Sequence, residues 1–85
     1  MVEKAKSLLE INLKEVIERV EQRYGVRLPR KIVMVDYGED VGDLFIKFSH
    51  EKIVDGEVTQ DGLTIMHYGE NNKLVAIEIT DITKL

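Results

Sequence analysis

The stretch Leu44-Phe45-Ile46-Lys47-Phe48 decides the fold, because its side chains alternate as those of a β-strand do. Successive side chains of a strand point to opposite faces of the sheet. Every second residue of the stretch is apolar and shares one face, while Phe45 and Lys47 take the other. Apolar residues therefore stand on both faces, as in strands that are buried on two sides. The sequence predicts a sheet that needs cover on each face.

Three more stretches are rich in β-branched and aromatic residues and predict further strands, at residues 32–37, 63–68 and 74–79. The dipeptide Asp55-Gly56 is a turn signal, which predicts a short irregular piece or a small hairpin between the second and third strands. Parallel strands need a crossover of about a dozen residues or more, so four strands with short connections predict an antiparallel meander.

Residues 2–24 show the period of an amphipathic helix. The apolar residues at spacings of three and four are Val2, Ala5, Leu9, Leu13, Val16, Ile17, Val20 and Tyr24. The expected contacts with the sheet are Leu9, Leu13, Val16 and Val20. Gly25 is the expected end of the helix, because glycine readily takes the left-handed conformation that follows many helices.

A second possible helix start lies inside this segment. Asn12 and Glu15 match a capping box, and Ile11 and Val16 match the hydrophobic staple around it. Two interpretations stay open. We favour one helix that is kinked near Asn12, in which Ile11 lies opposite the main stripe. The alternative is a helix that begins at Asn12, with residues 2–10 as a separate turn or arm.

These elements predict one α+β domain over residues 1–85, in which the helix (2–24) packs on a four-stranded antiparallel β-meander (31–82). One helix covers only one face of a sheet, and an apolar open face on so small a protein favours association. The candidate interface residues are Ile32, Met34, Phe45, Leu74, Ala76 and Glu78. The sequence therefore predicts a homodimer, in which Glu78 forms a cross-strand pair with Lys47 or meets a cation of the partner.

Composition excludes several classes of function. The chain of 85 residues has no cysteine, so it contains no disulfide, thiolate metal site or cysteine nucleophile. Its net charge of −4 gives no overall attraction to nucleic acid or to an anionic membrane. No apolar run exceeds four residues, which is too short for a membrane span or a signal peptide, so a cytoplasmic protein is expected. The high Glu, Lys and Arg content is also typical of thermophilic proteins.

Basic side chains gather near the predicted helix, and residues 1–30 carry a net charge of +2 against −6 for residues 31–85. The basic residues at the end of the helix and just after it are Arg19, Arg23, Arg27, Arg30 and Lys31. Such a ridge could contact phosphates, which makes nucleic-acid binding one alternative function. Cations are also favoured at the end of a helix for structural reasons alone, and the net negative charge opposes the alternative.

The two histidines, His50 and His67, suggest a further alternative. If the fold brought them together beside carboxylates, they could bind zinc or act in acid–base catalysis, as in a small metal-dependent hydrolase. Nothing in their spacing requires this, so no catalytic residue, metal ligand or cofactor is predicted. The acidic cluster Asp36, Glu39, Asp40 and Asp43 lacks the spacing of a calcium loop and is expected to be solvated.

The strand region resembles the domain of unknown function 2283 family, small bacterial and archaeal proteins. The matching parts are the segment 37–46 (Tyr37 to Ile46), Asp61-Gly62 and the segment 74–79, and together they extend over about residues 32–82. Gly38, Gly42 and Ala76 depart from the family pattern. The resemblance implies a small meander protein of unassigned activity, with some members similar to antitoxin-like partners. Our leading hypothesis is a non-catalytic interaction module that associates with itself and binds a protein partner.

Overall fold

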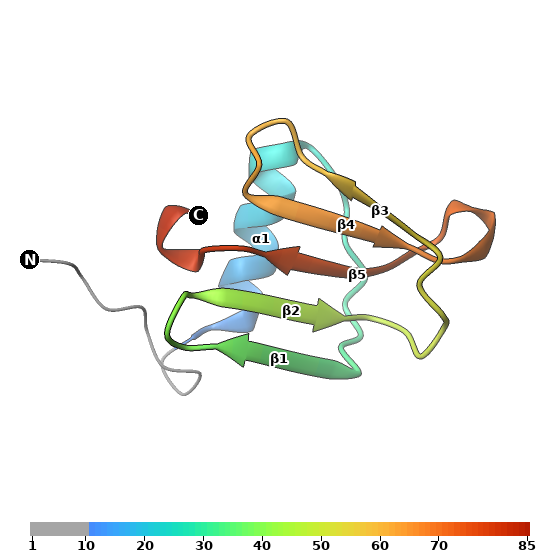
Figure 1. The fold of residues 1–85 in the computed structure, drawn as a ribbon, viewed down its shortest axis with the longest axis horizontal. Coiled ribbons are helices and arrows are strands. Elements are labelled where there is room, and N and C mark those ends of the chain that lie inside the picture. The colour runs from blue at the N-terminus through green and yellow to red at the C-terminus, as the bar shows by residue number, and fades with distance from the viewer. Residues whose placement is uncertain (1–10) are drawn as a thin grey trace, which may run out of the picture.

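Helix α1 crosses one face of a five-stranded antiparallel sheet in the computed structural model, which describes residues 11–85 (Figure 1). The elements are α1 (Leu13–Tyr24), β1 (Met34–Gly38), β2 (Asp43–Lys47), β3 (Asp55–Val58), β4 (Thr64–Tyr68) and β5 (Leu74–Ile79), with the 3-10 helices η2 (Glu70–Asn72) and η3 (Ile82–Lys84). The predicted α+β class is confirmed. No helix within residues 11–85 has the length and hydrophobicity that a membrane crossing requires.

The described helix begins and ends where its capping residues predict. Asn12 has an extended backbone and its side-chain oxygen accepts the Glu15 N–H at 3.2 Å, which satisfies one of the free donors of the first turn. Gly25 has φ +65°, the left-handed conformation of a helix stop. Ile11 packs against the core cluster that contains Val16, as a hydrophobic staple does. The predicted helix over residues 2–10 lies outside the described residues.

The strand order is β1-β2-β5-β4-β3, so the predicted four-stranded meander is wrong. The β1–β2 hairpin and the β3–β4 hairpin form the two sides of the sheet, and β5 pairs with β2 and β4 between them. The chain passes from β2 to β3 along one end of the sheet (Figure 1). On this path Phe48 N–H donates to the Val75 carbonyl at 2.7 Å, and Val54 N–H donates to the Tyr68 carbonyl at 2.9 Å.

The length of this connection explains why the meander rule fails. A move from β2 to β3 crosses three strand spacings, or about 15 Å. The seven residues from Phe48 to Val54 can span about 23 Å when extended, so they reach the far side without a helix. A short connection therefore restricts strand direction more strongly than it restricts strand order.

The fifth strand, β3, contains the dipeptide that the sequence suggested was a turn. Asp55 and Gly56 pair with Tyr68 and His67 of β4. All four residues of β3 are exposed, as expected for an edge strand that is held mainly by its backbone hydrogen bonds. The turn of this hairpin lies later, at Gly62, whose φ is +74°.

The core lies between α1 and the sheet. Its fully buried members from β2 and β5 include Leu44, Ile46, Ile77 and Ile79. Helix α1 contributes Val16, Ile17 and Val20, whereas Leu13 is only half-buried at the margin of the core. The predicted contacts at Val16 and Val20 are present, and the predicted contact at Leu9 lies outside the described residues.

Candidate functional site

The side of the sheet that faces away from α1 is uncovered by any element of residues 11–85, and we call it the open face (Figure 1). Strand pairing places its side chains in two rows. In the first row Asp36, Phe45, Glu78, Ile65 and Val58 stand opposite one another from β1 to β3. The second row runs in the same order through Met34, Lys47, Ala76, His67 and Gly56.

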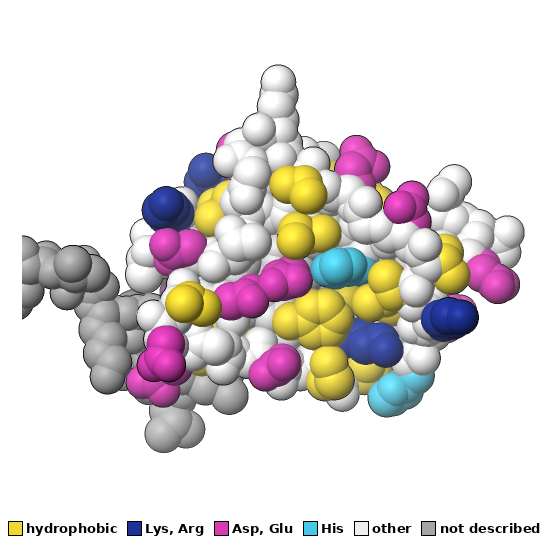
Figure 2. All heavy atoms as spheres, viewed as in Figure 1, with side chains coloured by type: hydrophobic (Ala, Val, Ile, Leu, Met, Phe, Trp, Pro, Cys, Tyr) yellow, Lys and Arg dark blue, Asp and Glu magenta, His cyan; other side chains and the backbone are white. Residues whose placement is uncertain are grey.

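Acidic and histidine side chains cross the middle of the open face, with hydrophobic side chains above and below them (Figure 2). The carboxyl group of Glu78 interacts with that of Asp43, and this interaction raises the pKa of Glu78. Glu78 Oε1 lies 3.7 Å from Nε2 of His67. The His67 ring meets Phe45 edge to face, with the ring centroids 5.6 Å apart.

The environment moves the pKa values of these groups in opposite directions. The hydrogen bond to the Asp43 carboxylate and partial burial together raise the pKa of Glu78 to about 7. Burial lowers the pKa of His67, because a charged imidazole is poorly solvated here. His67 is therefore neutral at physiological pH, and its contact with Glu78 is not a pairing of opposite charges.

Two polar atoms of this cluster lack partners. Asp43 Oδ1 and His67 Nε2 are buried, and neither forms a hydrogen bond with any described residue. An unsatisfied buried polar group costs about 1–3 kcal/mol, so proteins rarely keep one without a ligand, water or partner nearby. This combination of apolar surface and unsatisfied polar atoms distinguishes the open face from the rest of the described surface.

Lys47 lies on the same face and is half-buried. Its direct neighbours are Met34 and Ala76, and the ion pairs within residues 11–85 do not include it. The predicted cross-strand pair between Lys47 and Glu78 is therefore not formed in the described structure. Glu78 meets Asp43 and His67 instead.

The six candidate interface residues divide between the two sides of the sheet. Met34, Phe45 and Glu78 lie on the open face, and Met34 is 45% exposed. Ala76 also belongs to this face but is fully buried by its neighbours. Ile32 and Leu74 pack against the core cluster instead.

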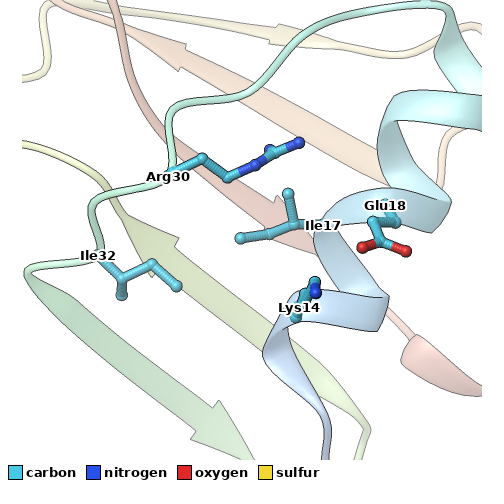
Figure 3. A pocket seen from close by; sticks show the side chains of 5 residues that line it. All are labelled: Lys14, Ile17, Glu18, Arg30 and Ile32. Atoms are coloured by element: carbon cyan, nitrogen blue, oxygen red, sulfur yellow. The ribbon is translucent and has the colours of Figure 1, made fainter.

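Ile32 and Ile17 form the apolar floor of a shallow groove beside α1, with Lys14, Glu18 and Arg30 at its rim (Figure 3). The groove holds about 280 Å³. Arg30 is not free to bind a ligand there, because its guanidinium forms two hydrogen bonds of 2.9 and 3.0 Å with the Glu21 carboxylate.

The basic ridge is largely neutralised by neighbouring carboxylates. Arg19 pairs with Glu15 at 2.8 Å, Arg23 pairs with Asp61 at 2.9 Å, and Arg30 pairs with Glu21 at 2.9 Å. Arg27 and Lys31 are exposed. Three of the five predicted phosphate contacts therefore have structural partners already.

The histidines occupy different settings. His50 is exposed in the connection after β2, while His67 lies in β4. Over residues 11–85, no three or more His, Asp and Glu side chains are arranged to hold a metal ion. The hydrolase alternative stays a prediction without a site assembled in the described part of the chain.

The members of the site that were not predicted as interface residues include Asp43, Ile65 and His67. Ile65 and His67 become part of the open face through their register with β5, which inserts between the two hairpins, whereas Asp43 belongs to it because it stands two residues before Phe45 in β2. The one residue in the sequence that pointed to this site was Glu78, a carboxylate in an otherwise apolar strand. That residue identified the correct face but not its neighbours.

Comparisons with known proteins do not extend this description. No family model matches the chain, and neither the curated proteins nor the solved structures contain a match to it. The resemblance to the domain of unknown function 2283 family stays a prediction.

Proposed function

We propose that this protein is a self-associating interaction module that binds a second copy of itself through the open face. One observation carries the proposal. An apolar sheet face, with no described element over it, contains the buried but unpartnered atoms Asp43 Oδ1 and His67 Nε2. A second sheet packed on this face would bury the apolar side chains and place polar groups of the second copy beside the carboxyl and imidazole groups that contain these atoms.

Burial of the apolar part of the open face would stabilise a dimer. Its side chains include Met34, Phe45, Val58 and Ile65, and Val58 is 59% exposed. Removal of apolar surface from water contributes about 25 cal/mol per Å². Two such faces can pack about 10 Å apart as the layers of a β-sandwich. The same sheet would then have α1 on one side and the second copy on the other.

Sedimentation equilibrium over nanomolar to micromolar concentrations tests the proposal. We expect a reversible dimer of the 9.8 kDa chain. Phe45→Lys and Met34→Lys should shift it towards the monomer, because each would place an amine against apolar surface. Met34 is the more exposed of the two sites, so this variant keeps the test valid if Phe45→Lys fails to fold.

Val26→Lys is the matched control. Val26 is 39% exposed but lies in the segment after α1, away from the open face. This variant should dimerise as the wild type does. A wild-type chain that remains monomeric at every concentration would contradict the proposal, and so would equal effects at Val26 and Met34.

A further inference from the structure

Among the described residues, the open face carries a cation with no ion-pair partner and a carboxyl oxygen with no hydrogen bond. Lys47 is half-buried and takes part in no ion pair of the described structure. Asp43 Oδ1 is buried and accepts no hydrogen bond from described residues. A half-buried cation and a buried acceptor on one face are complementary to each other, but only if something brings them together.

The fold keeps these groups apart within one copy. Asp43 and Lys47 are the two ends of β2 and point to the same face, with Phe45 between them. The four residue steps between them along the strand separate their Cα atoms by about 13 Å. Glu78 stands opposite Phe45 rather than opposite Lys47, and the nearby Asp43 carboxyl group raises its pKa.

We propose that Lys47 of each copy binds between the carboxyl groups of Asp43 and Glu78 of the other copy. This contact rests on the proposed self-association, and it fixes the orientation of the two copies relative to each other. A twofold axis that crosses β2 near Phe45 exchanges the two ends of the strand, so it forms the contact twice. The two β2 strands would then pack within about 30° of antiparallel, as in aligned β-sandwiches.

The protonation state of the carboxyl pair should control this contact. The titratable and charged groups of the open face are Asp36 from β1, Asp43 and Lys47 from β2, His67 from β4 and Glu78 from β5. A Lys47 amine from the partner favours loss of the Glu78 proton. Dimerisation should therefore release protons and become tighter as the pH rises through about 7, where Glu78 titrates. Protonation of His67 at lower pH adds positive charge near the Lys47 amine of the partner. It therefore also weakens association as the pH falls.

A charge-exchange experiment tests the contact directly. Lys47→Glu places a carboxylate against the carboxyl pair of its partner, and Glu78→Lys places an amine against Lys47. Each variant alone should raise the dimer Kd by about tenfold or more. An equimolar mixture of the two variants should restore a dimer close to the wild-type Kd. In the mixed dimer the new carboxylate at position 47 of one chain meets the new amine at position 78 of the other, and the native Lys47–Glu78 contact is kept at the second site.

Matched controls come from α1, on the opposite side of the sheet. Lys14→Glu and Glu18→Lys make the same charge changes at exposed helix positions and should leave the Kd unchanged. A wild-type dimer that tolerates both test variants, or a mixture that does not recover, overturns this inference and leaves the proposed function standing. A monomeric wild-type chain overturns both.

Discussion

The hydroxyl group of Tyr24, at the end of α1, lies 2.8 Å from Oγ1 of Thr64, at the start of β4. Thr64 is fully buried, and this is the one hydrogen bond of its hydroxyl group among the described residues. The Tyr24 hydroxyl group also lies 3.0 Å from Oδ2 of Asp61, in the β3–β4 turn. One helix residue therefore joins the last turn of α1 to both the hairpin turn and the strand that follows it.

The Tyr24–Thr64 hydrogen bond should show strong coupling in a double-mutant cycle. Tyr24→Phe leaves a buried hydroxyl group unsatisfied and should lower the free energy of unfolding by about 1–3 kcal/mol. Thr64→Val removes that hydroxyl group, so the double variant should be more stable than the sum of the two losses predicts. Urea unfolding of the four proteins provides the measurement. Strictly additive losses would mean that the hydrogen bond contributes nothing.

Asp61 should stabilise the chain through its charge. Its carboxylate accepts hydrogen bonds from Thr59 Oγ1 at 2.6 Å, Leu63 N–H at 3.1 Å and Arg23 Nε at 2.9 Å, and these contacts hold its pKa well below the usual range. Because the pKa is lowered by folding, this stability is present above the unfolded pKa of about 4 and is lost as the pH falls.

Asp61→Asn should therefore lower the urea midpoint at pH 7, and the difference from wild type should shrink in acid. Asp40→Asn removes an exposed carboxylate from the β1–β2 turn and serves as the control. Equal midpoints for wild type and Asp61→Asn at neutral pH would show that the contacts of Asp61 do not stabilise the fold.

Glu78 should act in the opposite sense. Its pKa is raised from 4.5 to about 7 in the folded chain, so its contribution to stability is present below about pH 4.5 and is lost as the pH rises towards 7. Glu78→Gln avoids this loss and should be more stable than the wild type by about 1–3 kcal/mol near pH 8. The two proteins should be about equally stable near pH 4.

The Glu78→Gln comparison requires protein concentrations at which both chains are monomeric, so that association does not contribute. Glu57→Gln, at an exposed position of β3, should keep the wild-type pH profile of stability. A Glu78→Gln chain that loses stability between pH 5 and pH 8 as steeply as the wild type would rule out a raised pKa at Glu78.

Alanine substitutions along α1 should lower the stability of the chain more strongly where the side chain is more deeply buried. Ile17 is 4% exposed, so Ile17→Ala should destabilise the chain by about 2–5 kcal/mol. Ile11→Ala and Leu13→Ala should cost less, because both side chains are only half-buried at the margin of the core. Glu18→Ala on the exposed side should change stability by less than about 0.5 kcal/mol. A cost at Leu13 above that at Ile17 would mean that the helix packs in a different rotation.

Local signals predicted the parts of the fold that depend on neighbouring residues. Asn12 and Gly25 mark the two ends of α1 as capping rules require, and four of the five strands overlap the predicted stretches. Strand β3 was missed because all its residues are exposed and its Asp55-Gly56 pair is typical of a turn. β3 is held by backbone hydrogen bonds to β4, and such bonds leave no hydrophobic pattern in the sequence.

The candidate site was predictable only in part, because register determines it. Alternation groups Phe45 with Lys47 and Glu78 with Ala76, but it does not tell which face the helix covers; the register shows that Phe45 and Glu78 stand opposite each other. Alternation failed at Leu74, where an irregularity in the β4–β5 pairing between His67 and Tyr68 interrupts it. His67 joined the site only because β5 lies between β2 and β4, and strand order cannot be obtained from the sequence of either strand.

The position of β5 has a consequence for the order of folding during synthesis. The hairpins β1–β2 and β3–β4 leave the ribosome before residues 74–79, and each can close on its own local pairing. Neither hairpin has a partner edge in the sheet until β5 arrives, because β5 pairs with both. A nascent chain halted before residue 74 therefore exposes two separate hairpins, and the step that joins them waits for the last strand to be made.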